Sequence, residues 1–172
     1  MSRIALKTGE FNSYYGNYIN LVNENKALVN ALEDGGKTAI SFFKKIPENK
    51  LKFAYADGKW TILEVILHII DTERIFNYRA LCIGRGDKTA FPGFEQDDYI
   101  APSKANSRSL ASLLEEYAAV RASSITLFKN MTDENLMSIG EASGSPLSPR
   151  AAGFIIAGHE QHHINIIEER YL

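Results

Sequence analysis

The chain has 172 residues, of which 45% are hydrophobic and 23% are charged, and its formal net charge is −2. This composition is typical of a folded domain and excludes a disordered or fibrous chain. Lys and Arg are scattered instead of forming a basic stripe, so we expect no nucleic-acid partner.

A chain of this length suits a single domain, which we take as residues 1–172, because a domain of this size buries roughly 70% of the surface its unfolded chain exposes. The longest apolar runs, VILHII and FIIAG, are far shorter than the about 20 residues that a membrane-spanning helix needs. The first residues show no apolar stretch long enough for a signal peptide. We therefore expect a cytoplasmic protein with no membrane partner.

The first predicted helix covers residues 22–47, where apolar residues recur at three- and four-residue spacing. Gly35 and Gly36 interrupt the pattern and mark the point where this helix would bend. Pro47 is expected to end it.

The second helix is predicted to start near Thr61, which forms an S/T-x-x-E capping box with Glu64, and to stop near Gly84. Its first three turns are apolar on nearly every side, which indicates burial on more than one side. One explanation is a subunit interface, so we predict a homodimer. The apolar residues concerned are Ile62, Leu63, Val65, Ile66, Leu67, Ile69 and Ile70.

Residues 87–107 contain two prolines and several acidic residues without any period, which predicts a long crossover loop. The third helix follows at about residues 109–131, and a short turn is expected from Thr132 to Met137. The aromatic residues that would order the loop are Phe91, Phe94 and Tyr99.

The last linker is GEASGSPLSP, and Ser148 with Pro149 then begins the fourth helix as N-cap and first helical residue. The sequence shows no strand pattern and no internal repeat. The fold class is therefore all-α, most simply a four-helix bundle whose crossover loop between helices two and three lets consecutive helices be non-adjacent.

Three of the four histidines in the chain lie inside the fourth helix, in a stretch of only five residues. His159 and His163 are one helical turn apart, so both imidazoles can bind one ion. They fall on the apolar arc of this helix, with His162 at its edge and Ile164 opposite. Two hydrogen-bonded interior histidines are the alternative, but they would need several polar partners there. His162 is expected to face solvent or to support the ligands, although positions 159 and 162 are also a feasible pair.

His159, Glu160 and His163 also match the H-E-x-x-H motif of zinc proteases. The chain lacks the extended form of that motif, because Ile166 stands at the position of its glycine and Glu169 stands at the position of its third histidine. Only nine residues follow His163, too few for the glutamate ligand of other zinc proteases.

A di-iron site would need a second E-x-x-H, whereas Glu64 lies four residues before His68. By elimination the third ligand is His68, the only other histidine, in the middle of helix two. Three histidines from two helices would leave a coordination position open.

Three segments together resemble the DinB-like family of four-helix metalloproteins. GKWTILEVILHIIDTERIFNYRAL is similar to its second helix, FPGFEQDDY to the loop that follows, and GHEQHHINIIEERYL to its last helix. The resemblance places His68, His159 and His163 at the ligand positions. It implies a bundle with an unusual helix order, frequent dimerisation and one divalent ion, with zinc or nickel as candidates. It also implies an activity found among family members, either that of a metal-dependent hydrolase or that of a transferase that uses a low-molecular-weight thiol.

Our leading functional prediction is a mononuclear metalloenzyme that activates a small thiol at the open coordination position. One alternative is a metal-dependent hydrolase that uses bound hydroxide, with Glu160 as candidate base; Glu160 lies off the apolar arc and is otherwise expected to be solvated or to support a ligand. Another is a non-catalytic metal-binding or interaction protein, which a closed coordination sphere would favour. The aromatic residues Tyr55, Trp60 and Phe91 are treated as packing residues.

Overall fold

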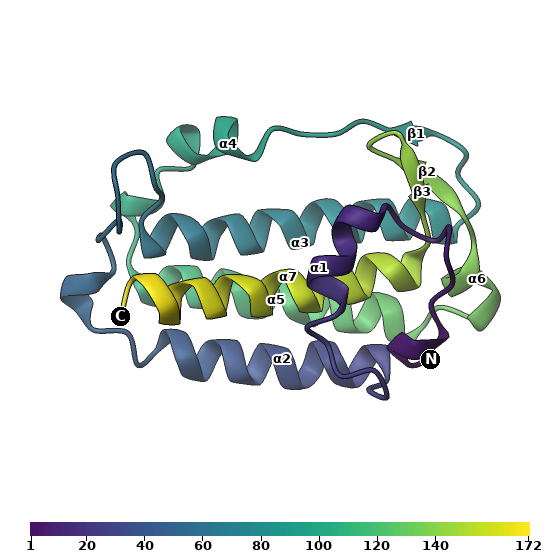
Figure 1. Cartoon of the computed structure of the whole chain (residues 1–172), viewed down its shortest axis with the longest axis horizontal. Helices are drawn as coiled ribbons and strands as arrows, with labels where there is room; N and C mark the ends of the chain where they lie inside the picture. The colour runs from purple at the N-terminus through teal and green to yellow at the C-terminus, as the bar shows by residue number, and fades with distance from the viewer.

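Four long helices form a bundle in this computed structural model, which describes residues 1–172 except for the side chain of Ile4 (Figure 1). The predicted all-α class is confirmed. The long helices are α2 (Leu28–Phe43), α3 (Ile62–Gly84), α5 (Leu110–Lys129) and α7 (Pro149–Arg170). Shorter helical elements are η1 (Arg3–Ala5), η2 (Ser13–Tyr15), α1 (Gly16–Ile19), η3 (Glu48–Lys50), α4 (Gln96–Ser103), η4 (Ala105–Ser107) and α6 (Asp133–Met137).

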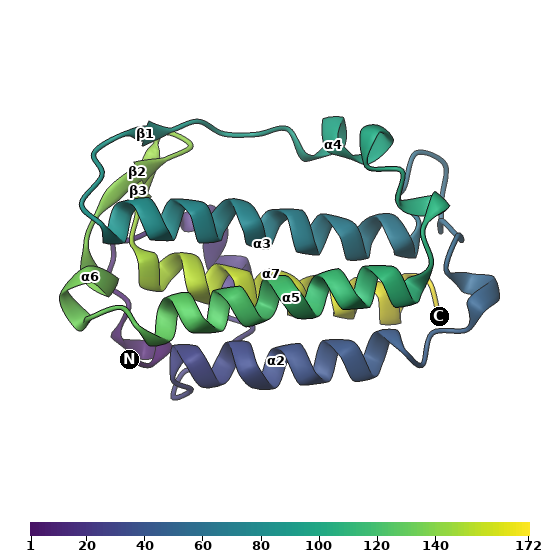
Figure 2. The same cartoon turned by 180° about the vertical axis from the view of Figure 1, so that it is seen from behind.

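Helices that follow each other in sequence do not all lie side by side. Both α5 and α7 pack against α2 and α3, so α2 and α3 occupy opposite corners of the bundle (Figures 1 and 2). Helix α1 lies across α7 on the side away from α5 (Figure 1). The crossover predicted between the second and third helices makes this order possible, because it returns the chain along α3 before α5 begins.

The crossover is held at both ends of α3. At one end, Arg79 Nη2 donates a hydrogen bond to the carbonyl oxygen of Pro92, 2.6 Å away. At the other end, Asn106 bonds to the side chains of Thr61 and Glu64 at 2.8 and 2.9 Å. These anchors stretch the intervening segment along the outside of α3.

The crossover also contains α4, where we predicted only a loop. Two acidic residues in its first turn favour a helix there, since carboxylates stabilise a helix N-terminus. Sequence periodicity missed this helix because none of its residues is buried, so no apolar stripe marks it.

A small three-stranded sheet lies at one end of the bundle, so the expectation of no strands was wrong. The hairpin turns at Ser143 and Gly144, whose positive φ angles of 53° and 70° suit a tight two-residue turn. Strands of two or three residues are too short for an alternating pattern to reveal. Strand β1 (Ala90–Phe91) pairs in parallel with β2 (Gly140–Ala142), which pairs antiparallel with β3 (Ser145–Leu147).

The predicted helix starts at Thr61 and Ser148 are confirmed. Both bonds of the Thr61–Glu64 capping box are formed, and Ser148 accepts from the backbone N–H of Ala151. The third long helix and the short α6 begin close to the predicted positions, and each follows a capping side chain, Ser109 and Thr132 respectively.

The first long helix begins at Leu28 and not at residue 22, because the Asn23 side chain accepts from the backbone N–H of Asn25 and holds a turn there. The helix also continues through Gly35 and Gly36. A Cβ at Gly35 would lie 2.9 Å from the Glu160 carboxylate, so this glycine permits close packing of a buried side chain.

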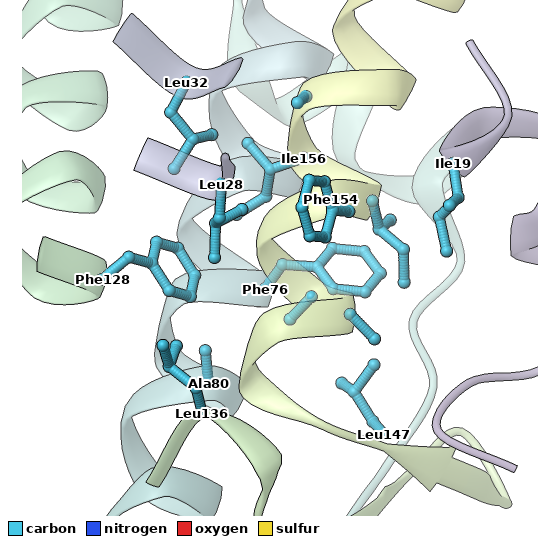
Figure 3. Packing of buried hydrophobic residues seen from close by; sticks show 14 of the residues in the cluster. Ile19, Leu28, Leu32, Phe76, Ala80, Phe128, Leu136, Leu147, Phe154 and Ile156 are labelled. Carbon is cyan, nitrogen blue, oxygen red and sulfur yellow. The ribbon is translucent and has the colours of Figure 1, made fainter. Parts of the chain in front are cut away.

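Two apolar cores fill the bundle, one toward the sheet and one toward the opposite end. Figure 3 shows part of the first core, which includes the buried rings of Phe76, Phe128 and Phe154. The second core contains the first turns of α3, whose apolar residues are at most 5% exposed. The chain itself therefore covers this surface, and its apolar character does not require a partner subunit.

A layer of buried polar side chains separates the two cores at the middle of the bundle. Its members, each at most 6% exposed, are His68, Thr72, Glu73, Arg121, Ser124, His159 and Glu160. Buried polar groups of this kind cost free energy unless they are paired or bind a ligand. We call this set the polar layer.

Candidate metal centre

Three histidines converge within the polar layer and at its edge. His68 comes from α3, and His159 and His163 come from α7, which packs against it. His159 Nε2 lies 3.0 Å from His68 Nε2 and 3.0 Å from His163 Nε2. Two nitrogens that bind one ion at about 2.0–2.1 Å with tetrahedral or octahedral angles are about 2.9–3.4 Å apart. These distances therefore fit a shared ion.

Hydrogen bonding alone does not account for this arrangement. A neutral imidazole nitrogen carries either one proton or one lone pair, so His159 Nε2 makes only one hydrogen bond. It nevertheless faces two other Nε2 atoms at 3.0 Å. A single cation between the three rings would satisfy all three lone pairs at once. The donor set thus fits a divalent metal.

The three rings are held in the neutral form that a metal ligand needs. Burial lowers the pKa of His68 to about 4. Burial, followed by repulsion between the neighbouring rings, holds the pKa values of His159 and His163 well below the usual range. Near neutral pH, protons therefore compete little with a cation for these nitrogens.

Aromatic rings and one hydroxyl surround the cluster. The Trp60 ring lies 4.8 Å from the His68 ring, and the Tyr18 ring stands edge-on to the His159 ring at 5.3 Å, measured between centroids. Thr72 Oγ1 lies 3.5 Å from His68 Nδ1, beside the nitrogen that faces away from the cluster. These neighbours limit how far the rings can turn.

His162 stays outside the cluster. In the part of the chain that the structure describes, the group that could hold a metal consists of His68, His159 and His163. His162 is half-buried, and its ring lies 5.1 Å from that of Tyr18. The geometry thus favours positions 159 and 163 over the pair 159 and 162.

Glu160 is not a solvated residue, contrary to the expectation from the apolar arc. It is 2% exposed and accepts hydrogen bonds from Tyr117 and from Arg121, whose Nη2 lies 2.8 Å from Glu160 Oε2. Arg121 also donates two 2.9 Å bonds to Glu73, which accepts from Ser124 as well. The arc assigned one buried face to this helix, whereas α7 packs against both α2 and α3. Glu160 is therefore buried beside Gly35 and Arg121, and even Ile164 is buried, in the second core.

This ion-pair network directs the Glu160 carboxylate away from the histidines. The single cation Arg121 is shared by two buried carboxylates, so the network stabilises the bundle only while all its members are paired. The Glu160 carboxylate is thus engaged with the arginine and the tyrosine on the opposite side of the polar layer.

The N-terminal segment covers the other side of the histidine cluster. A Cβ at Gly158 would collide with the backbone carbonyl of Tyr18, so only glycine lets α1 approach α7 this closely. Ile19 is 3% exposed in the first core and fixes the segment there. Sequence reasoning missed Tyr18, although three tyrosines within residues 14–18 were a visible signal.

Of the three aromatic residues treated as packing residues, two border the cluster. Tyr55 and Trp60 line a cavity of about 370 Å³ together with His163. Phe91 is 7% exposed and belongs to the first core, as expected of a packing residue.

A family model described as the DinB superfamily matches residues 31–167. The chain belongs to the DinB superfamily. The family expected from the three sequence motifs is therefore confirmed. None of the curated proteins matches the sequence.

This DinB chain also resembles a solved structure, that of YfiT from Bacillus subtilis. The two share 15% sequence identity, with a TM-score of 0.74 over 95% of this chain and 89% of YfiT. YfiT is described as a probable metal-dependent hydrolase with an unusual four-helix bundle topology. The likeness confirms the DinB-like four-helix fold. Among the described residues, no helix has the length and hydropathy needed to cross a bilayer.

Proposed function

We propose that this DinB protein is a metal-dependent enzyme that joins a low-molecular-weight thiol to a second substrate, with one divalent ion held by His68, His159 and His163. The observation that carries the proposal is the meeting of three Nε2 atoms, two of them 3.0 Å from the third. Imidazole nitrogen suits zinc and nickel, which are our candidates. When bound, such an ion would keep its full charge and lower the pKa of a thiol or a water beside it.

The surroundings of the cluster favour a thiol as nucleophile. A small thiol that loses its proton on binding needs no base from the protein, whereas attack by water is commonly helped by one. Glu160, the base of the H-E-x-x-H motif, is engaged by Arg121 and Tyr117. This arrangement argues against a peptidase.

A metal-dependent hydrolase is the second candidate, in line with the description of YfiT. Asp71 lies with His68 at a small cavity of about 10 Å³, which is about the room that one water molecule requires. Burial raises the pKa of Asp71, which makes its carboxylate a better proton acceptor. Asp71, and not Glu160, is therefore the candidate base for this alternative.

Activity assays separate these candidates. Protein purified without an affinity tag would be loaded with zinc or nickel and given thiols with an electrophile, ester substrates or peptides. We expect thiol conjugation that survives Glu160→Gln and Asp71→Asn but is lost in His159→Ala. Ester hydrolysis without thiol that is lost in Asp71→Asn would support the hydrolase instead. Peptide cleavage lost in Glu160→Gln would overturn the proposal.

A third candidate, a non-catalytic metal protein, would need a closed coordination sphere. Within the described residues the cluster offers three donors, and cavities adjoin His159 and His163. These cavities support an ion that a substrate can reach.

The homodimer and the cytoplasmic location remain proposals. Other parts of the same chain cover the apolar turns of α3, so these turns give no support to a dimer. Light scattering at micromolar concentration would show either twice the 19.2 kDa chain mass, as proposed, or a monomer.

A further inference from the structure

Two separate cavities adjoin the histidine cluster. The first, of about 330 Å³, reaches His159. We call it the tyrosine cavity, because its walls are Tyr14, Tyr15 and Tyr18 with Phe76, Phe94 and Ile155. The second, of about 370 Å³, reaches His163, and we call it the tryptophan cavity; its walls include Tyr55, Lys59, Trp60, Asp97, His162 and Tyr171.

Gln96 separates the two cavities. This first residue of α4 borders the tyrosine cavity, the tryptophan cavity and the small cavity beside His68. The crossover that carries it is anchored at both ends of α3, as described above. Two molecules could therefore reach the cluster from different sides of Gln96.

The tyrosine cavity is suited to a flat aromatic molecule. Two pairs of its rings stand nearly perpendicular: Tyr15 and Phe76 meet at 90° with centroids 5.6 Å apart, and Tyr14 and Tyr18 meet at 86° and 5.8 Å. Edge-to-face contacts of this kind are also favourable for an aromatic ligand. The only charged residue among the lining residues is Glu95, which is exposed, so no lining Lys or Arg would pair with an anionic ligand.

Two hydroxyl groups in this cavity give the ligand a polar contact. Tyr14 Oη and Tyr18 Oη are 3.1 Å apart, so one donates to the other and the second hydrogen remains for a ligand. An oxygen acceptor on an aromatic ring, such as a nitro or carbonyl group, matches this donor.

The tryptophan cavity has a different chemical character. Lys59 and Asp97 bring both signs of charge to its rim, and His162 adds a half-buried imidazole. Small thiols built on cysteine carry an amine and a carboxylate, which such a rim can pair.

We infer that the tyrosine cavity binds an aromatic electrophile with an oxygen acceptor, and that the thiol enters through the tryptophan cavity. This inference rests on the proposed thiol transferase function. In the reaction, sulfur forms a bond to the electrophilic carbon, the leaving group departs with the electrons of its own bond to that carbon, and the thiol proton passes to the buffer.

Equilibrium binding tests the ligand class without any catalysis. The unreactive nitroaromatic 2,4-dinitrotoluene would be titrated into metal-free protein and followed by calorimetry, with 1-octanol as the apolar but non-aromatic comparison. We expect Tyr15→Leu and Phe94→Leu each to weaken nitroaromatic binding about tenfold, because both keep an apolar side chain but remove a ring. Tyr55→Leu, the matched change in the tryptophan cavity, should leave it unchanged. Circular dichroism would check that each variant is folded.

Steady-state kinetics then test which of the two substrates each cavity binds. With zinc restored, 1-chloro-2,4-dinitrobenzene and L-cysteine are the probes. Tyr15→Leu should raise KM for the nitroaromatic alone, and Tyr55→Leu should raise KM for cysteine alone.

Failure of the inference and failure of the proposed function would look different. Absence of 2,4-dinitrotoluene binding to the wild type, binding no tighter than that of 1-octanol, or equal losses in Tyr15→Leu and Tyr55→Leu would overturn the inference. Selective binding without any conjugation would overturn the transferase function while supporting the aromatic ligand class.

Discussion

His159 Nε2 lies 3.0 Å from His68 Nε2, although 91 residues separate the two histidines along the chain. The contact exists because α3 and α7 are neighbours in the bundle while α3 and α2 are not. The proposed metal site thus depends on the helix order, and each of its parts can be altered by itself.

Glu160→Gln should reduce stability without removing the metal. The substitution takes one carboxylate from the ion-pair network, but Arg121 keeps Glu73, so the buried cation is not left alone. We expect the free energy of unfolding to fall by about 1–3 kcal/mol, as for a weakened buried charged hydrogen bond.

Urea denaturation and elemental analysis would measure these two quantities. Glu168→Gln is the matched control, because Glu168 is exposed on the same helix and its loss should cost less than about 0.5 kcal/mol. Loss of metal with unchanged stability in Glu160→Gln would mean that this carboxylate acts at the metal site after all.

Gly158→Ala should detach the N-terminal segment from α7. The added methyl group would collide with the Tyr18 carbonyl, so the segment must move, at a cost of about 1–3 kcal/mol. Limited proteolysis should cut within the first 20 residues faster than in the wild type, and the melting temperature should fall.

Gly16→Ala provides the control in the segment itself. No atom of the described residues lies within 4 Å of a Cβ at this position, and alanine favours the helical conformation that Gly16 adopts. Equal melting temperatures for Gly158→Ala and Gly16→Ala would show that the close approach is not needed.

A pH-dependent contribution to stability is expected from Glu10. Burial would raise its pKa, but hydrogen bonds from Arg150, from the backbone of Lys7 and from Ser148 outweigh burial and lower the pKa below the ordinary value of 4.5. A group whose pKa is lower in the folded state stabilises the fold above its unfolded pKa. That contribution is lost as the pH falls through the folded value.

Glu10→Gln tests this sign. At pH 7 we expect the variant to be less stable by about 1–3 kcal/mol, since Arg150 is 3% exposed and loses a charged partner. Urea denaturation between pH 7 and pH 3 should show this difference shrinking below about pH 4.5. A difference that stays constant over this range would contradict the lowered pKa.

The sequence predicted the elements that local chemistry determines. Thr61 with Glu64 and Ser148 with Pro149 fix helix starts through their own side chains, and helical spacing places His159 and His163 on one face. Helix α4 and the short strands escaped prediction because they bury too little to leave a periodic pattern.

The surroundings of the site depend on tertiary structure. Glu160 was expected to be solvated or to support a ligand. Sequence alone does not show that α7 packs against several helices or that Arg121 lies beside Glu160. Tyr18 and Gln96 reach the cluster only because the N-terminal segment and the crossover pack on either side of it. Such contacts join residues far apart in sequence, and no local pattern encodes them.

Metal binding to single-histidine variants tests the central claim most directly. Protein purified without an affinity tag would be stripped with a chelator and titrated calorimetrically with zinc and with nickel. We predict one ion per chain in the wild type, an affinity loss on the order of 100-fold or more in His68→Ala, His159→Ala and His163→Ala, and no comparable loss in His162→Ala. A wild-type protein that binds no ion, or a His162→Ala variant that loses the ion while His163→Ala keeps it, would contradict the account.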